Sequence, residues 1–401
     1  MNEHKAAEVA DIIPSIQAIR RDLHRHPELA FAETRTAALV ASELLAAGFE
    51  VTQGVGGTGV VGTLRAGLSG RAVALRADMD GLPALEQTGL PYASSTPGLM
   101  HACGHDGHTA MLLGAARQLA RTRRFNGTVH VVFQPAEEKG RDSGAPRMIA
   151  DGLFERFPAD AVFAMHTHPG IPTGTFLVRP GPFMAASDRI TIDVQGRSGH
   201  AGRPHLTADA LVAASGIVTA LQSIVARNAN PIDPAVVTVG ILQSGTAYNV
   251  VPGNAHLELS VRSFSEQTRT LLRDRIASLA VAQATSYGAR ATVDYQPGYP
   301  VLQNSAAATA FAAGVARELV GPGAVTDDAA PMMASEDFAY MLQERPGCLL
   351  RLGNGIDSSP VHHPCYDFDD ANLPIGIAFW TRLVERFLPT TQTAPHATPG
   401  A

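Results

Sequence analysis

Cysteine is scarce in this chain of 401 residues. Only Cys103, Cys348 and Cys365 occur, and an odd count in a long sequence favours reduced thiols over a disulfide framework. The start, MNEHKAAEVADIIPSIQAIR, has no apolar core of a signal peptide, and no stretch elsewhere approaches the length of a membrane span. We therefore expect a cytoplasmic protein that has no membrane partner.

A concentrated basic surface is also missing. The chain has 31 Lys and Arg against 37 Asp and Glu, a net charge of −6 and an isoelectric point near 6.2. Nucleic-acid binding needs clustered positive charge, so this balance excludes nucleic acid as the main partner and favours a small molecule. The 45% hydrophobic content is typical of a folded protein, and 42.1 kDa exceeds the usual size of one domain, which predicts two.

The first part of the chain alternates between helical and strand patterns. Helical spacing from Ile13 to about Ala47, interrupted by Pro27, predicts two helices, and Asp106 can cap a third that runs to about Leu119. Apolar, β-branched segments predict strands around residue 51 and at residues 60–64, 72–77, 127–134 and 161–165. This alternation predicts an α/β fold with a mixed, largely parallel sheet flanked by helices. Such sheets bind ligands beyond the carboxyl ends of their strands.

After about residue 185 the order of predicted strands and helices changes. Strands are predicted at residues 189–194, 236–242, 256–261 and 290–295, with helices at 208–226 and 266–286. The resulting order, βαββαβ, is that of the ferredoxin-like unit. We therefore expect a discontinuous domain of residues 1–185 and 298–401, with an inserted ferredoxin-like α+β domain at residues 186–297. The Thr-, Pro- and Ala-rich tail after Pro389 is expected to be disordered.

Five candidate metal ligands are scattered along the sequence. They are Cys103 and His105 in HACGHDGH, Glu138 in FQPAEE, His166 in AMHTHPG and His362 in VHHPCYDFDD. In an extended segment, residues i and i+2 point to one side, so Cys103 and His105 can reach the same metal. Spacing alone leaves His168 and His363 as alternatives to their neighbours. A mononuclear catalytic zinc needs only three protein ligands, so five donors suggest two metal ions.

Three acidic residues near these candidates could support the chemistry. Glu137 precedes Glu138 and could take a proton from a metal-activated water, although paired glutamates are more often solvated surface. Asp78 and Asp80 end the strand AVALRA and could orient a ligating imidazole, or could simply cap the turn that follows.

The inserted domain carries three further candidates. His200 in SGHAGRPH could donate a hydrogen bond to a developing oxyanion. Asn249 in AYNVVP and Arg262 at the end of a strand could hold a substrate carboxylate. From the residues alone, side chains in such positions are more often structural than functional.

Seven segments together resemble one known family. They are LHRHPELAFAET, HACGHDGHTAMLLGAA, VFQPAEE, MHTHPG, SGHAGRPH, ASEDFAY and HHPCYDFDD. The sequence, from about residue 15 to 385, resembles the dinuclear metal-dependent amidohydrolases typified by hippurate hydrolase and the plant indole-acetyl-amino-acid hydrolases. These are a branch of the aminoacylase and carboxypeptidase G2 superfamily.

The resemblance implies that N-acyl or N-aroyl amino acids are hydrolysed to a carboxylic acid and an amino acid with two divalent metal ions, Zn, Mn, Ni or Co. One alternative is a dipeptidase or N-acetyl-amino-acid deacetylase that uses the same site. Another is a non-catalytic protein that binds a ligand or senses metal.

The resemblance also implies roles for single residues. By motif position the implied ligands are Cys103, His105, Glu138, His166 and His362, and Glu137 is the base that deprotonates the water between the metals. The discontinuous domain is expected to be the catalytic, metal-binding domain, and the inserted domain is expected to serve as a lid and to form a homodimer. His200 then reaches an active site, commonly the partner's. Asn249 and Arg262 match lid positions associated with the substrate carboxylate. His168 stands where relatives often have tryptophan, which leaves the substrate preference open.

Overall fold

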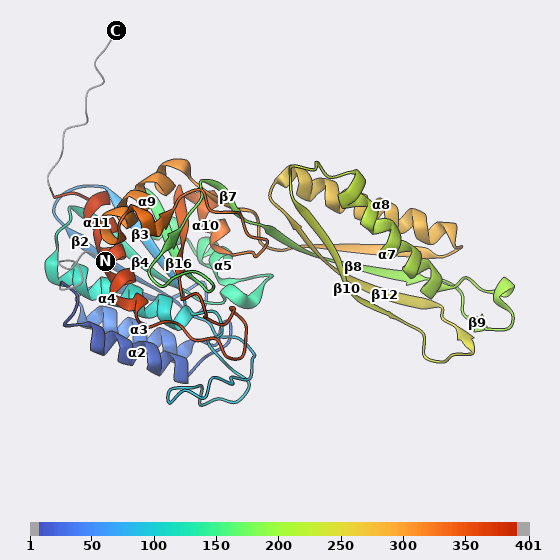
Figure 1. The fold of residues 1–401 in the computed structure, drawn as a ribbon, viewed down its shortest axis with the longest axis horizontal. Helices are drawn as coiled ribbons and strands as arrows, with labels where there is room; N and C mark the ends of the chain where they lie inside the picture. The colour runs from blue at the N-terminus through green and yellow to red at the C-terminus, as the bar shows by residue number, and fades with distance from the viewer. Residues whose placement is uncertain (1–7, 391–401) are drawn as a thin grey trace, which may run out of the picture. The chain divides into compact units, whose positions relative to one another are not determined.

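The computed structural model describes residues 8–390, which form two compact units (Figure 1). The first unit comprises the chain up to Gly181, Gln303–Ala330 and the chain from Tyr340 onward, and the second comprises Pro182–Leu302 and Pro331–Ala339. The short segment joins the second unit because the Ala185 N–H donates to the carbonyls of Met332 and Ala334. Residues from 391 onward, which hold nearly all of the tail predicted to be disordered, lie outside the described residues.

The first unit is built on a mixed sheet of eight strands. In sheet order these are β1 (Glu50–Val55), β2 (Gly59–Ala66), β4 (Gly127–Gln134), β3 (Ala72–Asp78), β5 (Ala161–His168), β16 (Gly347–Gly353), β6 (Phe176–Leu177) and β15 (Val325–Thr326). The central neighbours β4, β3, β5 and β16 run parallel. Strands β1 and β2 run antiparallel to their neighbours, and β6 runs antiparallel to β16 but parallel to β15. Every residue of β3 and β16 is buried, as expected for parallel strands covered on both faces. The predicted fold class is confirmed.

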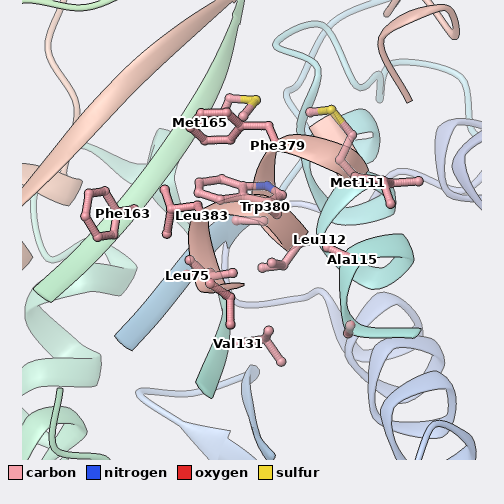
Figure 2. Packing of buried hydrophobic residues seen from close by; sticks show 14 of the residues in the cluster. Leu75, Met111, Leu112, Ala115, Val131, Phe163, Met165, Phe379, Trp380 and Leu383 are labelled. Atoms are coloured by element: carbon pink, nitrogen blue, oxygen red, sulfur yellow. The ribbon is translucent and has the colours of Figure 1, made fainter. Parts of the chain in front are cut away.

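The helices of the first unit cover this sheet. They are α2 (Ile13–Arg25), α3 (Thr34–Ala46), α4 (His105–Thr122), α5 (Gly144–Ala150), α6 (Leu153–Arg156), α9 (Ala306–Val320), α10 (Phe338–Glu344) and α11 (Asn372–Phe387), although the first two residues of α10 fall in the second unit. Proline stands in the first turn of α2, and α2 ends shortly before Pro27, as the sequence predicts. Trp380 of α11 lies within a large apolar core, among side chains of β3, β5 and α4 (Figure 2).

The second unit has the predicted βαββαβ order. Its main elements are β8 (Ala186–Gln195), α7 (Ala210–Arg227), β10 (Ala235–Ser244), β12 (Asn254–Ser263), α8 (Glu266–Ser286) and β13 (Arg290–Pro297). The strands form an antiparallel sheet in the order β10-β12-β8-β13, which α7 and α8 cover on one face (Figure 1). Asp209 and Ser265 cap the two helices with side-chain oxygens. Two smaller pairs, β9 (Gly199–His200) with β11 (Val250–Val251) and β7 (Gly181–Met184) with β14 (Leu302–Asn304), complete the strands.

Helix α7 is unusually apolar for a helix at a surface. Its 18 residues have a mean hydropathy of 1.5, so it is long and apolar enough to cross a membrane. The expectation that no stretch approaches that length is therefore wrong for this segment. Its inner residues, among them Ile217 and Leu221, pack into the apolar core of the second unit.

A buried histidine should make the stability of the first unit depend on pH. His130 on β4 is 3% exposed, and its Nε2–H donates to the Pro158 carbonyl while its Nδ1 lies 2.9 Å from the Thr63 hydroxyl. Burial lowers the pKa of His130 to about 4 from its ordinary 6.5. Its stabilising contribution is therefore complete above pH 6.5. It is lost as the pH falls from about 6.5 to 4, because only the unfolded chain then takes up the proton.

We predict that the free energy of unfolding of His130→Gln falls less steeply from pH 7 to pH 5 than that of the parent. The difference in slope should be at most about 1.4 kcal/mol per pH unit. Urea denaturation at several pH values measures it, with His205→Gln, at an exposed position of the second unit, as the control. Equal slopes for His130→Gln and the parent would contradict the prediction.

Candidate metal centre

The carboxyl ends of three neighbouring strands carry the predicted acidic and histidine candidates. Asp78 is the last residue of β3, and Asp80 follows it by two positions. Glu137 and Glu138 begin a 3-10 turn after β4, and His166 lies near the end of β5. Because β4, β3 and β5 are parallel neighbours, these ends meet at one edge of the sheet.

The five predicted ligands form two groups of three donors that share Cys103. In the first group, donor atoms of Cys103, His105 and His166 lie within 4.8 Å of one another. In the second group, the same holds for Cys103, Glu138 and His362. Cys103 Sγ lies 3.3 Å from His166 Nε2, and His362 Nε2 lies 2.9 Å from Glu138 Oε1. All five predicted ligands are thus brought together.

A left-handed turn at Gly104 presents both Cys103 and His105 to the site. Gly104 has φ +84° and is the N-cap of α4, so His105 is the first helical residue. The predicted extended geometry of this segment is therefore wrong. A Cβ on Gly104 would lie 2.5 Å from the Tyr366 hydroxyl and 2.7 Å from Thr167 Cγ2, so no larger residue fits.

Two other segments reach the site through unusual backbone conformations. His362 has φ +67°, and its N–H donates to the Ala102 carbonyl over 2.7 Å. Ala136, immediately before Glu137, has φ +55°. Residues other than glycine rarely adopt a positive φ, and those that do cluster at functional sites.

Asp80 orients one member of each donor group. Its Oδ1 lies 3.2 Å from His105 Nδ1, and its Oδ2 accepts the Glu138 N–H over 2.9 Å. This contact directs His105 Nε2 into the cluster, where that atom is buried and has no hydrogen-bond partner among the described residues. The arrangement is that of a carboxylate that holds a ligating imidazole.

His166 and His168 differ in where their rings are held. The His166 Nδ1–H donates to the Thr167 carbonyl over 2.7 Å, which leaves Nε2 facing Cys103. His168 is not part of either donor group. Both residues lie within β5, so the expectation that they follow a strand ending at residue 165 is wrong.

The electrostatics of the two groups favour a bound cation. Burial and the Glu138 carboxylate raise the pKa of the Cys103 thiol, so its thiolate needs compensating positive charge. Cys103 and Glu138 raise the pKa of His362 to about 10, whereas burial and Arg351 hold the pKa of His166 well below its usual range. A thiol, three imidazoles and a carboxylate are the donors that zinc-like divalent ions accept. The residues present therefore fit such ions.

Glu137 lies beside this donor set. It is 6% exposed, and a carboxylate oxygen lies within 4.8 Å of donor atoms of His105 and Glu138. The 3-10 turn brings both glutamates to the same cluster, although an extended strand end would point them apart. Glu138 belongs to a Cys103 group and Glu137 does not.

The candidates of the second unit lie at opposite ends of its sheet. His200 pairs with Val250, and the Asn249 carbonyl accepts the Ala201 N–H, so His200 and Asn249 are neighbours close to the start of β12. Arg262 lies eight residues along β12 from Asn254, about 26 Å at the usual rise of a strand. Its Nη1 donates to the Ser335 hydroxyl over 3.0 Å.

Sequence reasoning missed a buried ionic network that adjoins His105. Arg20 of α2 pairs with Asp106 (3.4 Å), Asp367 (2.9 Å) and Asp370 (2.8 Å), and His24 Nδ1 lies 2.8 Å from Asp106. Burial opposes a charged imidazole, but Asp106 and Glu86 raise the pKa of His24 to about 9. The prediction that Asp106 caps α4 is wrong, because Gly104 is the N-cap. The Asp106 carboxylate instead pairs with Arg20 and His24. The available signals were the i, i+4 spacing of Arg20 and His24 and, far along the chain, the acidic segment DFDD at residues 367–370.

Residues 74–386 match the model of Peptidase family M20/M25/M40. The chain belongs to this family. It is 40% identical to hippurate hydrolase of Campylobacter jejuni over 95% of this chain and 98% of that protein. It is 38% identical to N-acetyl-L-cysteine deacetylase of Bacillus subtilis over 93% of this chain and 88% of that protein. The structure resembles the Bacillus subtilis YxeP protein, a dinuclear metal-binding peptidase from the M20 family, with a TM-score of 0.83 and 33% identity over 95% of this chain and all of that chain.

In this M20-family chain, Gly104→Ala should disrupt both donor groups, because a methyl group would displace Thr167 or Tyr366 in addition to straining φ. We predict that the variant is destabilised by about 1–3 kcal/mol and binds fewer metal ions per chain. Thermal unfolding and metal counting after dialysis measure the two effects. Gly98→Ala is the matched control, since Gly98 has φ +85° and no atom within 4 Å of its Cβ position. Unchanged metal content in Gly104→Ala would contradict the prediction.

Proposed function

We propose that this chain hydrolyses the amide bond of N-acyl or N-aroyl amino acids, such as benzoyl-glycine, to a carboxylic acid and an amino acid. The observation that carries the proposal is the pair of donor groups around Cys103, with Glu137 beside them. The name of the Campylobacter relative, hippurate hydrolase, supports this substrate class. The first unit is then the catalytic domain and the second the lid. The enzyme is proposed to act in the cytoplasm, on dissolved substrates, without a nucleic-acid or membrane partner.

Two divalent ions would be held by these groups. Cys103, His105 and His166 would hold one, and Cys103, Glu138 and His362 the other. When bound, such ions polarise the amide carbonyl and lower the pKa of water toward about 7. Zn, Mn, Ni and Co are the candidates, and the thiol and imidazole donors favour zinc.

Glu137 is proposed to move the proton. Its carboxylate would accept a proton from the attacking water and return it to the leaving amine. This assignment suits a carboxylate that is buried next to the donors but belongs to neither Cys103 group. Asp80 would keep His105 and the Glu138 backbone in place during the reaction.

Replacing Glu137 with Gln should lower kcat by about 10²–10⁴-fold, because the amide cannot accept the proton. Metal content should stay at the parent value, since neither Cys103 group loses a donor. Steady-state kinetics with benzoyl-glycine and elemental analysis give the two readouts, and Glu155→Gln, at an exposed site, is the control. Parent-like turnover in Glu137→Gln would refute the role.

A second candidate function uses the same site on smaller acyl groups. The Bacillus relative named N-acetyl-L-cysteine deacetylase supports an N-acetyl-amino-acid deacetylase, with a dipeptidase as a further form. The values of kcat/KM for benzoyl-glycine, N-acetyl amino acids and free dipeptides, measured side by side, distinguish these substrates. A fully metal-loaded protein that hydrolyses none of them would favour the non-catalytic binding protein.

We also propose that two chains pair through the second unit. Leu211, Val212 and Val225 of α7 are 38–43% exposed, which is unusual for apolar side chains in one helix. Strand β10 stands at the edge of its sheet, where it could pair with another chain. These surfaces suit a second copy of the chain.

Pairing of two chains would bring together three candidate residues that lie far apart within one second unit. His200 and Asn249 lie close to the start of β12, whereas Arg262 lies about 26 Å along that strand from Asn254, which is too far for one small substrate to touch all three. A site that uses all three side chains therefore needs two chains. Arg262 would come from one chain, and His200 and Asn249 from its partner.

Mixing two inactive variants tests this arrangement. Glu137→Gln and His200→Ala, unfolded and refolded together in equal amounts, should recover about a quarter of the parent activity. Half of the dimers are mixed, and each mixed dimer has one intact site. Glu137→Gln mixed with Cys103→Ser is the control and should recover nothing, because each chain then carries a defect in its own donor groups and neither site of a mixed dimer is intact. Failure of the first mixture would mean that His200 does not act in the partner's site.

A further inference from the structure

A row of hydrogen-bonded side chains crosses the ends of the central strands. Gln134 Oε1 accepts from Arg76 Nε over 2.9 Å, and Arg76 Nη1 donates to Asp78 over 2.7 Å. Asp78 Oδ1 lies 2.6 Å from His108 Nδ1, and His108 Nε2 lies 2.9 Å from the Thr167 backbone nitrogen. All five residues, here called the buried row, are at most 2% exposed.

Four of the five members of the buried row lie within three residues of a residue of the proposed metal centre. Gln134 ends β4, three residues before Glu137, and Asp78 ends β3, two residues before Asp80. His108 lies one helical turn after His105 in α4, and Thr167 directly follows His166 in β5. The buried row therefore ties together the segments that carry these residues.

The hydrogen bonds fix the tautomer of His108. A backbone N–H can only donate, so His108 Nε2 must accept from Thr167. The proton of the neutral ring is then on Nδ1, which donates to Asp78. Both ring nitrogens are occupied, so neither offers a lone pair to a cation. His108 is thus not a ligand, although its donor atoms lie within 4.8 Å of those of Asp78 and His105.

The backbone of Thr167 is hydrogen-bonded both to His108 and to His166, a proposed ligand. Its N–H is held by His108, and its carbonyl accepts the Nδ1–H of His166 over 2.7 Å. His166 Nε2 consequently faces Cys103 Sγ at 3.3 Å. We propose that His108 is a positioning residue that holds Thr167, and through it the His166 imidazole, in the orientation that binds one of the two metal ions. This inference rests on the proposed two-metal site.

Two substitutions separate the two hydrogen bonds of His108. In His108→Asn, the amide nitrogen of the new side chain can replace Nδ1 toward Asp78, but this side chain is too short to reach Thr167. In His108→Gln, the amide oxygen can replace Nε2 toward Thr167, and the contact with Asp78 is lost. Positioning through Thr167 therefore predicts that the Asn variant is damaged more than the Gln variant.

The direct readout is metal binding. We expect His108→Asn to weaken binding of one of two Co²⁺ ions by about 10–100-fold, and His108→Gln to weaken it much less. Titration followed by the visible absorption of Co²⁺, with metal counting, measures both ions without any turnover. His130→Asn, a buried histidine of β4 outside the buried row, is the control and should lower the thermal stability while leaving both affinities unchanged.

Two results would overturn the inference. One is equal weakening in His108→Asn and His108→Gln, and the other is equal weakening of both ions. If the variants do not fold, the ¹⁵N shifts of the His108 ring in the parent decide, because the inference requires protonated Nδ1 and unprotonated, unligated Nε2 before and after addition of diamagnetic Zn²⁺. A parent that binds two ions but hydrolyses no amide would refute the proposed function and leave this inference standing.

Discussion

One buried sulfur atom belongs to both donor groups. Cys103 is 6% exposed, and burial opposes its ionisation, so the thiolate can form only with positive charge beside it. The same atom lies within 4.8 Å of donor atoms of His105 and His166 in one group and of Glu138 and His362 in the other. The position of Cys103 therefore determines whether five residues from distant segments act as one site or as unrelated polar side chains.

Two buried sets of hydrogen-bonded polar side chains connect the segments that carry the donor residues. The buried row links β4, β3, α4 and β5, and the Arg20 network links α2, the start of α4 and the segment that follows His362. Buried charges are tolerated only when they are paired and hydrogen-bonded, and removal of one partner costs several kcal/mol. Both sets consist mainly of side chains outside the two Cys103 groups, and their mutual pairing accounts for many of the charged residues in the interior of the first unit.

The sequence predicted much of the structure that depends on local pattern. Periodicity located β1 to β5 and the βαββαβ order of the second unit, but not β6, β15 or β16, which lies next to β5 in the main sheet. The resemblance named the candidate ligands that the structure brings together. Contacts between distant residues were not predictable. His24 and Asp106 are 82 positions apart, so the ionic role of Asp106 was mistaken for a helix cap. The turn at Gly104 was also missed, because its cause is the later packing of Tyr366 and Thr167 against it.

The shared role of Cys103 can be measured directly. Crystals of the zinc-loaded protein, with anomalous scattering collected at the zinc edge, locate every bound ion. The account predicts two ions per chain, both bonded to Cys103 Sγ at about 2.3 Å. A single ion, or a second ion without a bond to that sulfur, would contradict it.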